Sequence, residues 1–247
     1  MKTIVDGLAV EYADEGHGGV LVMLHGWGDS LRTFDALTAE LVATHRIVRL
    51  DLPGFGGTER PKGAWTVSDY AVFVKKFLEK FGINTYVIVG HSFGGRVAIK
   101  GAGRGILTPQ TVVLMASAGN ARRRTIRNGA YLVAAKIGKG VSLILPMRVR
   151  ERMRARLYKS AESDYDAAGP MKDIFLNTIR EDLSADATNI QQSTLLIWGG
   201  RDEVTPLYDG KRLADRVPHS KIVVIPQAGH FLHREYPREV AGHIRSI

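Results

Sequence analysis

Short apolar runs alternate with helical patterns along most of this chain. Continuous runs of Val, Ile and Leu predict strands buried on both faces, and apolar residues spaced three and four apart predict helices. We expect a short hairpin around Asp6-Gly7, and six further strands at 20–24, 46–50, 86–89, 111–116, 195–198 and 222–225. We expect helices at 33–44, 68–81, 93–103, 206–216 and 235–247, with Ser68-Asp69 as a cap. This alternation predicts an α/β protein with a mostly parallel, doubly wound sheet and helices on both faces.

The alternation stops after the strand at 111–116 and resumes near residue 191. Between about 120 and 190 the pattern predicts helices and no convincing strand. We therefore expect two units: a core formed by 1–119 and 191–247, and a helical insertion formed by 120–190.

Reactive side chains follow five of the predicted strands, each just past the strand's end. In open α/β sheets, sites form where the carboxyl ends of the strands meet. The five side chains should therefore gather at one edge; they are His25, Asp51, Ser92, Asp202 and His230.

The stretch 87–95, V-I-V-G-H-S-F-G-G, combines a buried strand, a tight turn and a helix start. The pattern G-x-S-x-G in this context is a nucleophile elbow, whose strained turn exposes the serine at the end of the sheet. Gly90 and Gly94 lack a Cβ, so neighbouring backbone can pack close to the bend. The helix that starts at Phe93 directs unpaired N–H groups toward Ser92. This stretch predicts Ser92 as a nucleophile.

Several motifs, taken together, resemble those of α/β-hydrolases with a helical cap, and the resemblance covers nearly the whole chain. The motifs are His25-Gly26-Trp27-Gly28, Asp51-Leu52-Pro53-Gly54-Phe55-Gly56, Gly90-His91-Ser92-Phe93-Gly94-Gly95, Gly199-Gly200-Arg201-Asp202 and Gly229-His230. Their order Ser…Asp…His is the order expected for that fold. The family's dehalogenases and epoxide hydrolases would carry aspartate in place of Ser92, so the serine argues against both chemistries. The resemblance makes 120–190 the cap, and Asp51 a structural loop residue.

His230 and Asp202 are the expected partners of Ser92. The His230 ring would take the Ser92 proton and later give it to the leaving group, while Asp202 orients the ring. His233 is the rival base, and we favour His230 because it sits at a strand end, whereas His233 falls on the following turn. Glu203 is the rival acid, and we favour Asp202 because the adjacent Glu203 side chain would point elsewhere.

The resemblance assigns the oxyanion hole to the backbone N–H groups of Trp27 and Phe93. His25 and His91 are interpreted as hydrogen-bonded framework, with His91 pointing into the fold. His25 and Gly26 are also expected to border the substrate pocket. Within the cap, the long apolar stretch 130–145 predicts an acyl or aromatic pocket, with Tyr131, Ile137, Val141 and Met153 as candidate lining residues.

Composition further limits the class of protein that the sequence can encode. The 247 residues are 45% hydrophobic, which suits one large domain, and no apolar run reaches the ~18–20 residues that a membrane helix needs. There is no signal-peptide pattern and no cysteine, which fits a cytoplasmic protein. No metal-ligand motif is present. The glycine-rich stretch Gly54–Gly57 is not a dinucleotide fingerprint, because a polar loop with Pro61 follows it in place of a helix. We therefore expect no cofactor and no metal.

The positive charge is concentrated in one segment. The formal net charge is +9, but residues 121–160 hold twelve Lys and Arg against the single acid Glu151. We favour a cap helix that packs Val149, Met153 and Leu157 inward and leaves its arginines in water. The alternative is a docking surface for an acidic partner, such as an acyl-carrier protein, a nucleic acid or an anionic membrane. Aromatic residues are scarce there, which argues against nucleic acid.

The sequence thus predicts a serine hydrolase that cleaves a small carboxylic ester through an acyl-enzyme. The alternatives are a carbon–carbon bond hydrolase, a cofactor-free perhydrolase or acyltransferase with the same triad, and a binding receptor that turns over little.

Overall fold

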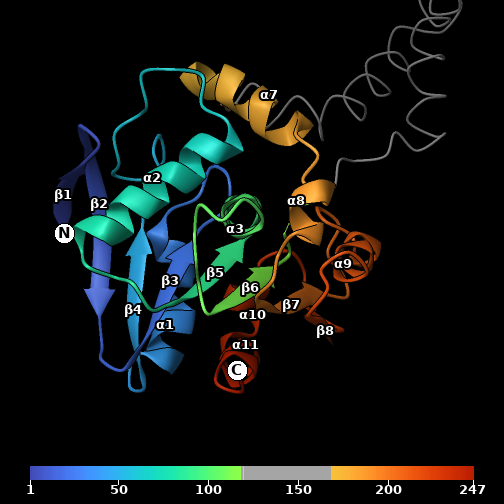
Figure 1. The fold of residues 1–247 in the computed structure, drawn as a ribbon. Coiled ribbons are helices and arrows are strands. Elements are labelled where there is room, and N and C mark those ends of the chain that lie inside the picture. Colours follow the sequence, from blue (N-terminus) through green and yellow to red (C-terminus); the bar gives the residue numbers. More distant parts are fainter. Residues whose placement is uncertain (118, 120–167) are drawn as a thin grey trace, which may run out of the picture.

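The computed structural model of the protein describes residues 1–117, 119 and 168–247 (Figure 1). Within these residues, eight strands form one sheet in the order β1-β2-β4-β3-β5-β6-β7-β8. The strands are β1 (Lys2–Val5), β2 (Leu8–Glu15), β3 (Gly19–Leu24), β4 (His45–Leu50), β5 (Val87–His91), β6 (Thr111–Met115), β7 (Ser193–Gly199) and β8 (Ser220–Ile225).

The sheet is mostly parallel. The hairpin β1–β2 is antiparallel, and β2 pairs antiparallel with β4, whereas the strands from β4 to β8 all run parallel. The chain begins its parallel part at β3, moves outward to β4, then crosses back to β5 on the other side of β3. This reversal brings the carboxyl ends of β3 and β5 side by side. The predicted fold class is confirmed.

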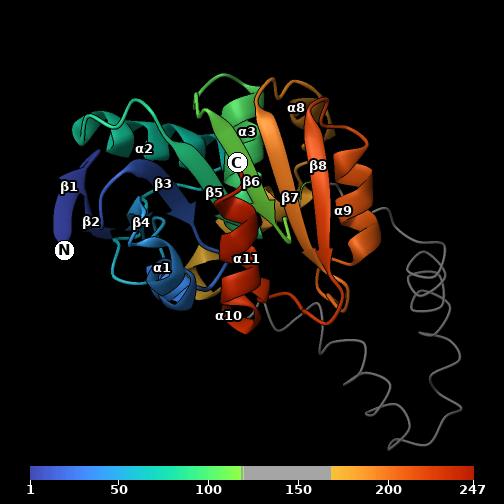
Figure 2. The same cartoon turned by 90° about the horizontal axis from the view of Figure 1, so that it is seen from below.

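Helices cover both faces of the sheet (Figures 1 and 2). One face carries α2 (Val67–Lys80) and α3 (Phe93–Gly103), whose apolar side chains join the larger buried cluster. The other face carries α1 (Asp35–Leu41) and α11 (Pro237–Ile244), whose side chains join a second cluster. Helix α9 (Leu207–Ala214) adds Leu213 to the first cluster. Both faces are therefore closed to water, as the uninterrupted apolar strands predict.

Three helix boundaries differ from the sequence expectation. The predicted helix at 33–44 divides into a 3₁₀ turn, η1 (Leu31–Phe34), and α1. Helix α2 is capped by Thr66 and not by Ser68: the Asp69 amide donates to Thr66 Oγ1 at 3.4 Å, and the Thr66 amide to Asp69 Oδ2 at 2.7 Å. The predicted helix at 235–247 begins earlier, as α10 (Leu232–Glu235), and restarts at Pro237. Proline cannot donate a helical hydrogen bond, so it suits the first turn of α11 and not the interior of one long helix.

The described part of the insertion is helical. It contains η2 (Gly169–Met171), α7 (Lys172–Arg180) and α8 (Ser184–Thr188). Helix α8 packs on α3, and Leu183, Ala187 and Ile190 belong to the larger core cluster. The division into core and cap remains a prediction. The basic segment and the candidate pocket residues Tyr131, Ile137, Val141 and Met153 lie outside the described residues.

None of the helices in the described ranges is both long enough and apolar enough to cross a membrane.

Candidate active site

Ser92 occupies the turn between β5 and α3 in a strained conformation, with φ 50° and ψ −109°. Such backbone angles are rare for a residue with a side chain and must be imposed by the surroundings. The Ser92 amide donates to the Met115 carbonyl of β6 at 3.0 Å. A Cβ built on Gly94 would lie 2.0 Å from the Leu24 carbonyl oxygen, and one on Gly90 would lie 2.6 Å from the Gly94 carbonyl oxygen. The two glycines thus permit the close packing that fixes the turn.

Asp202 and His230 meet at the ends of β7 and β8. His230 Nδ1 lies 2.9 Å from Asp202 Oδ2, and the Asp202 side chain has no exposed surface. Because a carboxylate only accepts hydrogen bonds, this contact places the ring proton on Nδ1 and leaves Nε2 as the basic nitrogen. The exposed Glu203 and the buried His233 make no such contact with this pair within the described ranges.

The environment of Asp202 favours the ionised carboxylate. Burial alone would raise the pKa of Asp202, but hydrogen bonds and charge from His230, with hydrogen bonds from Thr205, lower the pKa below its ordinary value. The amides of Val204 and Thr205 donate to Oδ1 at 2.9 and 2.8 Å. Asp202 can therefore stay charged beside the His230 ring near neutral pH.

His91 and His233 form a buried layer beneath His230. The His91 ring lies 4.8 Å from the His230 ring and 4.4 Å from the His233 ring, centre to centre. His91 Nε2 donates to the His230 carbonyl at 3.0 Å, and His233 Nε2 lies 2.9 Å from the Thr33 hydroxyl. Burial, then the neighbouring His233 and His230, hold the pKa of His91 well below its ordinary value. His91 thus points into the fold, as the sequence predicts, and ties the residue before Ser92 to the His230 loop.

The loop that follows β3 lies against the Ser92 turn. A Cβ on Gly26 would lie 3.4 Å from Ser92 Cβ and 3.2 Å from His91 Nδ1, so the chain at Gly26-Trp27 borders the serine directly. His25 is fully buried; its Nδ1 donates to the Gly26 carbonyl at 2.7 Å and its Nε2 accepts from the Leu52 amide at 2.9 Å. Burial lowers the pKa of His25. Both nitrogens are occupied, which matches the framework interpretation better than a place in a substrate pocket.

Asp51 has the structural role that the resemblance implies. It is buried, and its carboxylate accepts from the Leu31 amide at 2.6 Å and the Gly57 amide at 2.7 Å. The Asp51 side chain therefore holds together the loops that follow β3 and β4.

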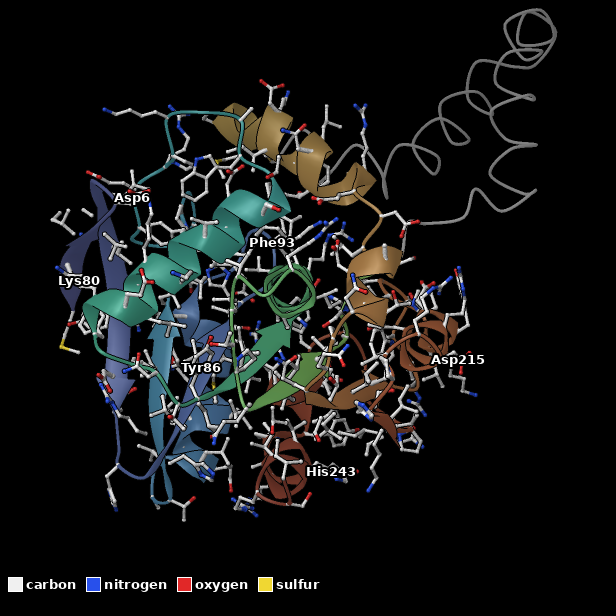
Figure 3. The ribbon with its side chains drawn as sticks, in the orientation of Figure 1. Asp6, Lys80, Tyr86, Phe93, Asp215 and His243 are labelled. Carbon is white, nitrogen blue, oxygen red and sulfur yellow. The ribbon has the colours of Figure 1, made fainter. Side chains whose placement is uncertain are left out.

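Aromatic side chains surround Trp27. Its ring contacts Phe55, Phe93 and Phe175 at centroid distances of 4.8, 5.4 and 5.1 Å. Phe93 also packs on Tyr70 of α2, and lies where α3 begins (Figure 3). Trp27 is half-buried, whereas Phe55, Phe93 and Phe175 are buried. The side of the site next to the predicted oxyanion donors is thus aromatic, and α7 contributes to it through Phe175.

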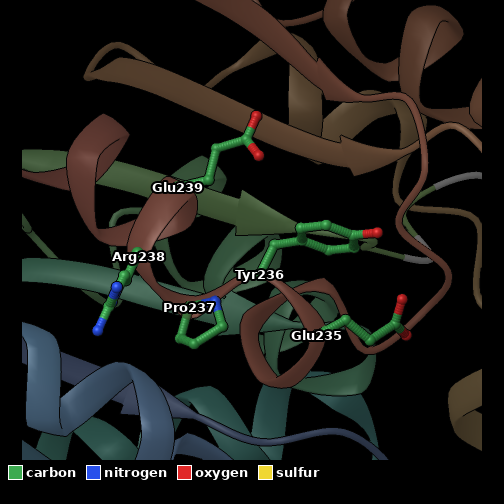
Figure 4. A pocket seen from close by; sticks show the side chains of 5 residues that line it. All are labelled: Glu235, Tyr236, Pro237, Arg238 and Glu239. Atoms are coloured by element: carbon green, nitrogen blue, oxygen red, sulfur yellow. The ribbon is translucent and has the colours of Figure 1, made fainter.

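A separate surface pocket lies at the junction of α10 and α11, lined by Glu235, Tyr236, Pro237, Arg238 and Glu239 (Figure 4). It contains none of the predicted site residues. Glu235 nevertheless reaches the loop that carries His230, because its Oε2 accepts from the Gly229 amide at 2.7 Å.

Two residues near His230 are missed by the sequence analysis, Thr205 and Glu235. Thr205 Oγ1 lies 2.7 Å from Asp202 Oδ2. The position of Thr205, three residues after Asp202, is a signal that could have indicated it, since an Asp side chain often accepts from backbone amides that follow it closely in the chain.

Within the described residues, no group of three or more His, Asp or Glu side chains is arranged to hold a metal ion.

A model of the alpha/beta hydrolase family matches residues 21–243. The match spans most of the chain and includes each of the strand-end residues described above. The protein therefore belongs to the alpha/beta hydrolase family, and it is a hydrolase by that membership.

Three relatives are similar over nearly their whole length. The chain is 27% identical to the uncharacterized hydrolase YugF of Bacillus subtilis, over 97% of this chain and 94% of that protein. It is 26% identical to a 2-hydroxymuconate semialdehyde hydrolase of a Pseudomonas species, over 98% and 90% of the two chains. It is 26% identical to the pimeloyl-[acyl-carrier protein] methyl ester esterase of Nitrosomonas europaea, over 91% and 93%. Relatives named for different substrates are thus similar to this chain at nearly the same identity.

Solved structures support the fold. A crystal structure of a bacterial membrane phospholipase A superposes with a TM-score of 0.77 at 22% identity, over 100% of this chain and 84% of the other.

Proposed function

We propose that this protein is a serine hydrolase that cleaves a carboxylic ester through an acyl-enzyme, with Ser92 as nucleophile, His230 as general base and Asp202 as the orienting acid. The observation that carries the proposal is the 2.9 Å contact between the Asp202 carboxylate and His230 Nδ1, at the same sheet edge as the strained Ser92 turn.

The chemistry follows from the protonation states of this pair. His230 Nε2 accepts the Ser92 proton while Oγ attacks the carbonyl carbon of the ester. The imidazolium that forms is stabilised by the Asp202 carboxylate on its other nitrogen. It then gives its proton to the departing alcohol as the carbon–oxygen bond breaks. Water attacks the acyl-enzyme with His230 again as base, which releases the acid and restores Ser92.

Negative charge on the tetrahedral intermediate needs two N–H donors. Phe93 is the first residue of α3, so its N–H has no partner within the helix. Trp27 follows Gly26, which lies against Ser92. The backbone N–H groups of Phe93 and Trp27 are therefore the proposed oxyanion hole, and one such donor is typically worth on the order of 10²–10³ in rate.

The surroundings favour an ester with a mainly apolar acyl part. Trp27 is half-buried within the aromatic group that Phe55, Phe93 and Phe175 form around it. Aromatic rings bury large apolar area and recognise apolar or flat ligand groups. Tyr131, Ile137, Val141 and Met153 stay candidate pocket residues from the sequence and lie outside the described residues.

The first experiment measures hydrolysis of short p-nitrophenyl esters and labelling by a fluorophosphonate probe. We expect wild type to turn over the esters and to be labelled at Ser92. Ser92→Ala should lose both, with the rate falling by about 10³-fold or more. Ser68→Ala alters a serine in the first turn of α2 that makes none of the site contacts described above, so it is the matched control and should behave as wild type. Equal turnover by Ser92→Ala and wild type would contradict the assignment.

The same experiment separates the alternatives. The similarity to a 2-hydroxymuconate semialdehyde hydrolase favours carbon–carbon cleavage as the second candidate. Labelling at Ser92 with poor ester turnover and rapid cleavage of a vinylogous diketone would support it. Ester-dependent acyl transfer to hydrogen peroxide or to an added alcohol would indicate a perhydrolase or acyltransferase. An unlabelled protein that binds ester without turnover would indicate a receptor.

A further inference from the structure

The Thr205 hydroxyl lies between the ends of three strands. Its Oγ1 is 2.7 Å from Asp202 Oδ2, which follows β7, and 3.3 Å from Nδ1 of His230, which follows β8. It is also 3.1 Å from the carbonyl oxygen of Ala116, just past β6. The Thr205 residue is buried, with 6% of its surface exposed. Its hydroxyl is therefore held among fixed polar atoms rather than solvated.

A count of donors shows what the hydroxyl supplies. Asp202 Oδ1 accepts from the amides of Val204 and Thr205, at 2.9 and 2.8 Å. Oδ2 has the His230 ring nitrogen at 2.9 Å and the Thr205 hydroxyl at 2.7 Å. A carboxylate offers about four acceptor sites, and this one has no exposed surface through which water could fill a gap. Without the hydroxyl, Oδ2 would depend on His230 alone.

The single hydroxyl proton has two oxygen acceptors within reach. Hydrogen bonds to a charged acceptor are shorter and roughly twice as strong as those between neutral groups. The shorter distance to the Asp202 carboxylate, compared with that to the Ala116 carbonyl, agrees with this preference. The proton therefore belongs on the Asp202 side, and Thr205 competes with His230 for the same oxygen.

The backbone of Thr205 is anchored as firmly as its side chain. Its carbonyl accepts from the Trp198 ring nitrogen at 2.7 Å, and Trp198 is fully buried. The hydroxyl is thus presented at a fixed position, which a positioning role requires.

We propose that Thr205 is a positioning residue, whose hydroxyl orients Asp202 Oδ2 toward His230 and shares the charge of that oxygen, so that it sets the orientation of the His230 ring and how strongly Asp202 stabilises the imidazolium. This inference rests on the proposed role of the Ser92, His230 and Asp202 side chains.

Two opposite substitutions separate the hydroxyl from the rest of the side chain. Thr205→Val keeps the shape and removes the hydroxyl, whereas Thr205→Ser keeps the hydroxyl and removes the methyl group. In Thr205→Val, Asp202 Oδ2 loses one hydrogen-bond donor, so more of its negative charge is available to stabilise the His230 imidazolium. The acidic limb of the kcat/KM profile should then move to higher pH. We expect kcat to fall about 10-fold, which is about 1.4 kcal/mol in activation free energy, with KM nearly unchanged.

The experiment measures kcat, KM and the pH profile of p-nitrophenyl ester hydrolysis for wild type and both variants, with fluorophosphonate labelling rates as a second readout. Recovery of the wild-type rate and pH profile in Thr205→Ser supports the inference. An unchanged Thr205→Val overturns it, and so does an equal loss in both variants, which would assign the effect to packing of the methyl group.

Thermal unfolding and tryptophan fluorescence show whether each variant retains the native fold. If Thr205→Val does not fold, Thr205→Ser still tests the inference, since loss of its activity or a shifted pH profile with the fold intact would overturn it. A wild type that neither labels nor hydrolyses contradicts the proposed function itself. A wild type that does both, beside an unchanged Thr205→Val, contradicts only the role of Thr205.

Discussion

The Lys100 ammonium lies 2.5 Å from Asp186 Oδ2, and both side chains are buried. Lys100 also contacts Glu181 at 2.7 Å, and Arg104 pairs with the other oxygen of Asp186. This ionic group joins α3, which starts at the Ser92 turn, to α8 at the end of the insertion. It therefore connects the part of the fold that positions Ser92 with the segment that returns to the core.

We predict that Asp186→Ala strongly destabilises the protein, because it removes the fully buried partner of Lys100 and leaves only the partly exposed Glu181 to pair with that charge. Loss of one member of a buried pair typically costs about 3–5 kcal/mol. Arg104→Ala should cost under about 1 kcal/mol, since 58% of the Arg104 side chain is exposed. Urea unfolding measures both. Similar midpoints for the two variants would show that burial of this pair has little influence on stability.

A second prediction compares the same glycine-to-alanine change at two positions. In Gly94→Ala the new Cβ would lie 2.0 Å from the Leu24 carbonyl oxygen, so α3 must move away from β3. We expect a loss of about 3 kcal/mol or more and loss of any esterase activity. Gly242→Ala adds a methyl group on α11, where nothing lies within 4 Å, and should stabilise the protein by about 0.5–1 kcal/mol. The urea unfolding midpoints of the two variants and of wild type test this prediction. If Gly94→Ala were as stable as wild type, the tight packing at the elbow would not be required.

Glu235 provides a third prediction, because its carboxylate holds the amide of the residue before His230. Glu235→Ala should free the loop and lower kcat by about 10-fold, since small misplacements of a catalytic group are costly. Glu235→Gln keeps an acceptor oxygen and should retain most of the activity. Glu239→Ala removes an exposed carboxylate from the same surface pocket and serves as control (Figure 4). Equal activity in Glu235→Ala and Glu239→Ala would contradict this role.

The fourth prediction concerns acid stability. Burial, then the nearby charges of Arg234 and His230, lower the pKa of His233 from 6.5 to about 3. Between these two values the unfolded chain takes up a proton that the native protein does not, so stability falls as the pH is lowered below about 6.5. His233→Gln removes this proton uptake. Its fall in Tm between pH 7 and pH 5 should be smaller than that of wild type by roughly 4 °C.

His17→Gln alters an exposed histidine and is the matched control for the pH series. A His233→Gln variant whose Tm falls as steeply as that of wild type would show that His233 does not contribute to the acid sensitivity.

Much of the fold could be predicted because the central strands consist of short, continuous apolar runs. The runs at 20–24 and 86–89 leave no alternative to burial on both faces, and burial on both faces requires helices above and below. The reactive residues could be placed because a parallel sheet brings the ends of its strands to one edge. We could therefore select Ser92, Asp202 and His230 from the sequence without knowing any side-chain contact.

What could not be predicted depends on contacts between distant segments. Thr66 and Ser68 are both residue types that commonly cap helices, so residue type alone does not choose between them. The backbone angles of that turn decide that Thr66 caps α2. The sequence offers His233 as a rival base, yet it is fully buried beside His91. Thr205 becomes notable only when its hydroxyl is seen beside the Asp202 carboxylate. The role of the basic segment 121–160 stays a prediction.

The bend at position 92 is enforced from outside, by glycine contacts with β3 and by a hydrogen bond from the Ser92 amide to β6. Its unusual backbone angles consequently owe nothing to the hydroxyl itself. Ser92→Cys should therefore keep the same backbone turn, and it would place a thiol where the hydroxyl of the proposed nucleophile now lies. The shape of this turn is therefore independent of whether position 92 carries an oxygen or a sulfur atom.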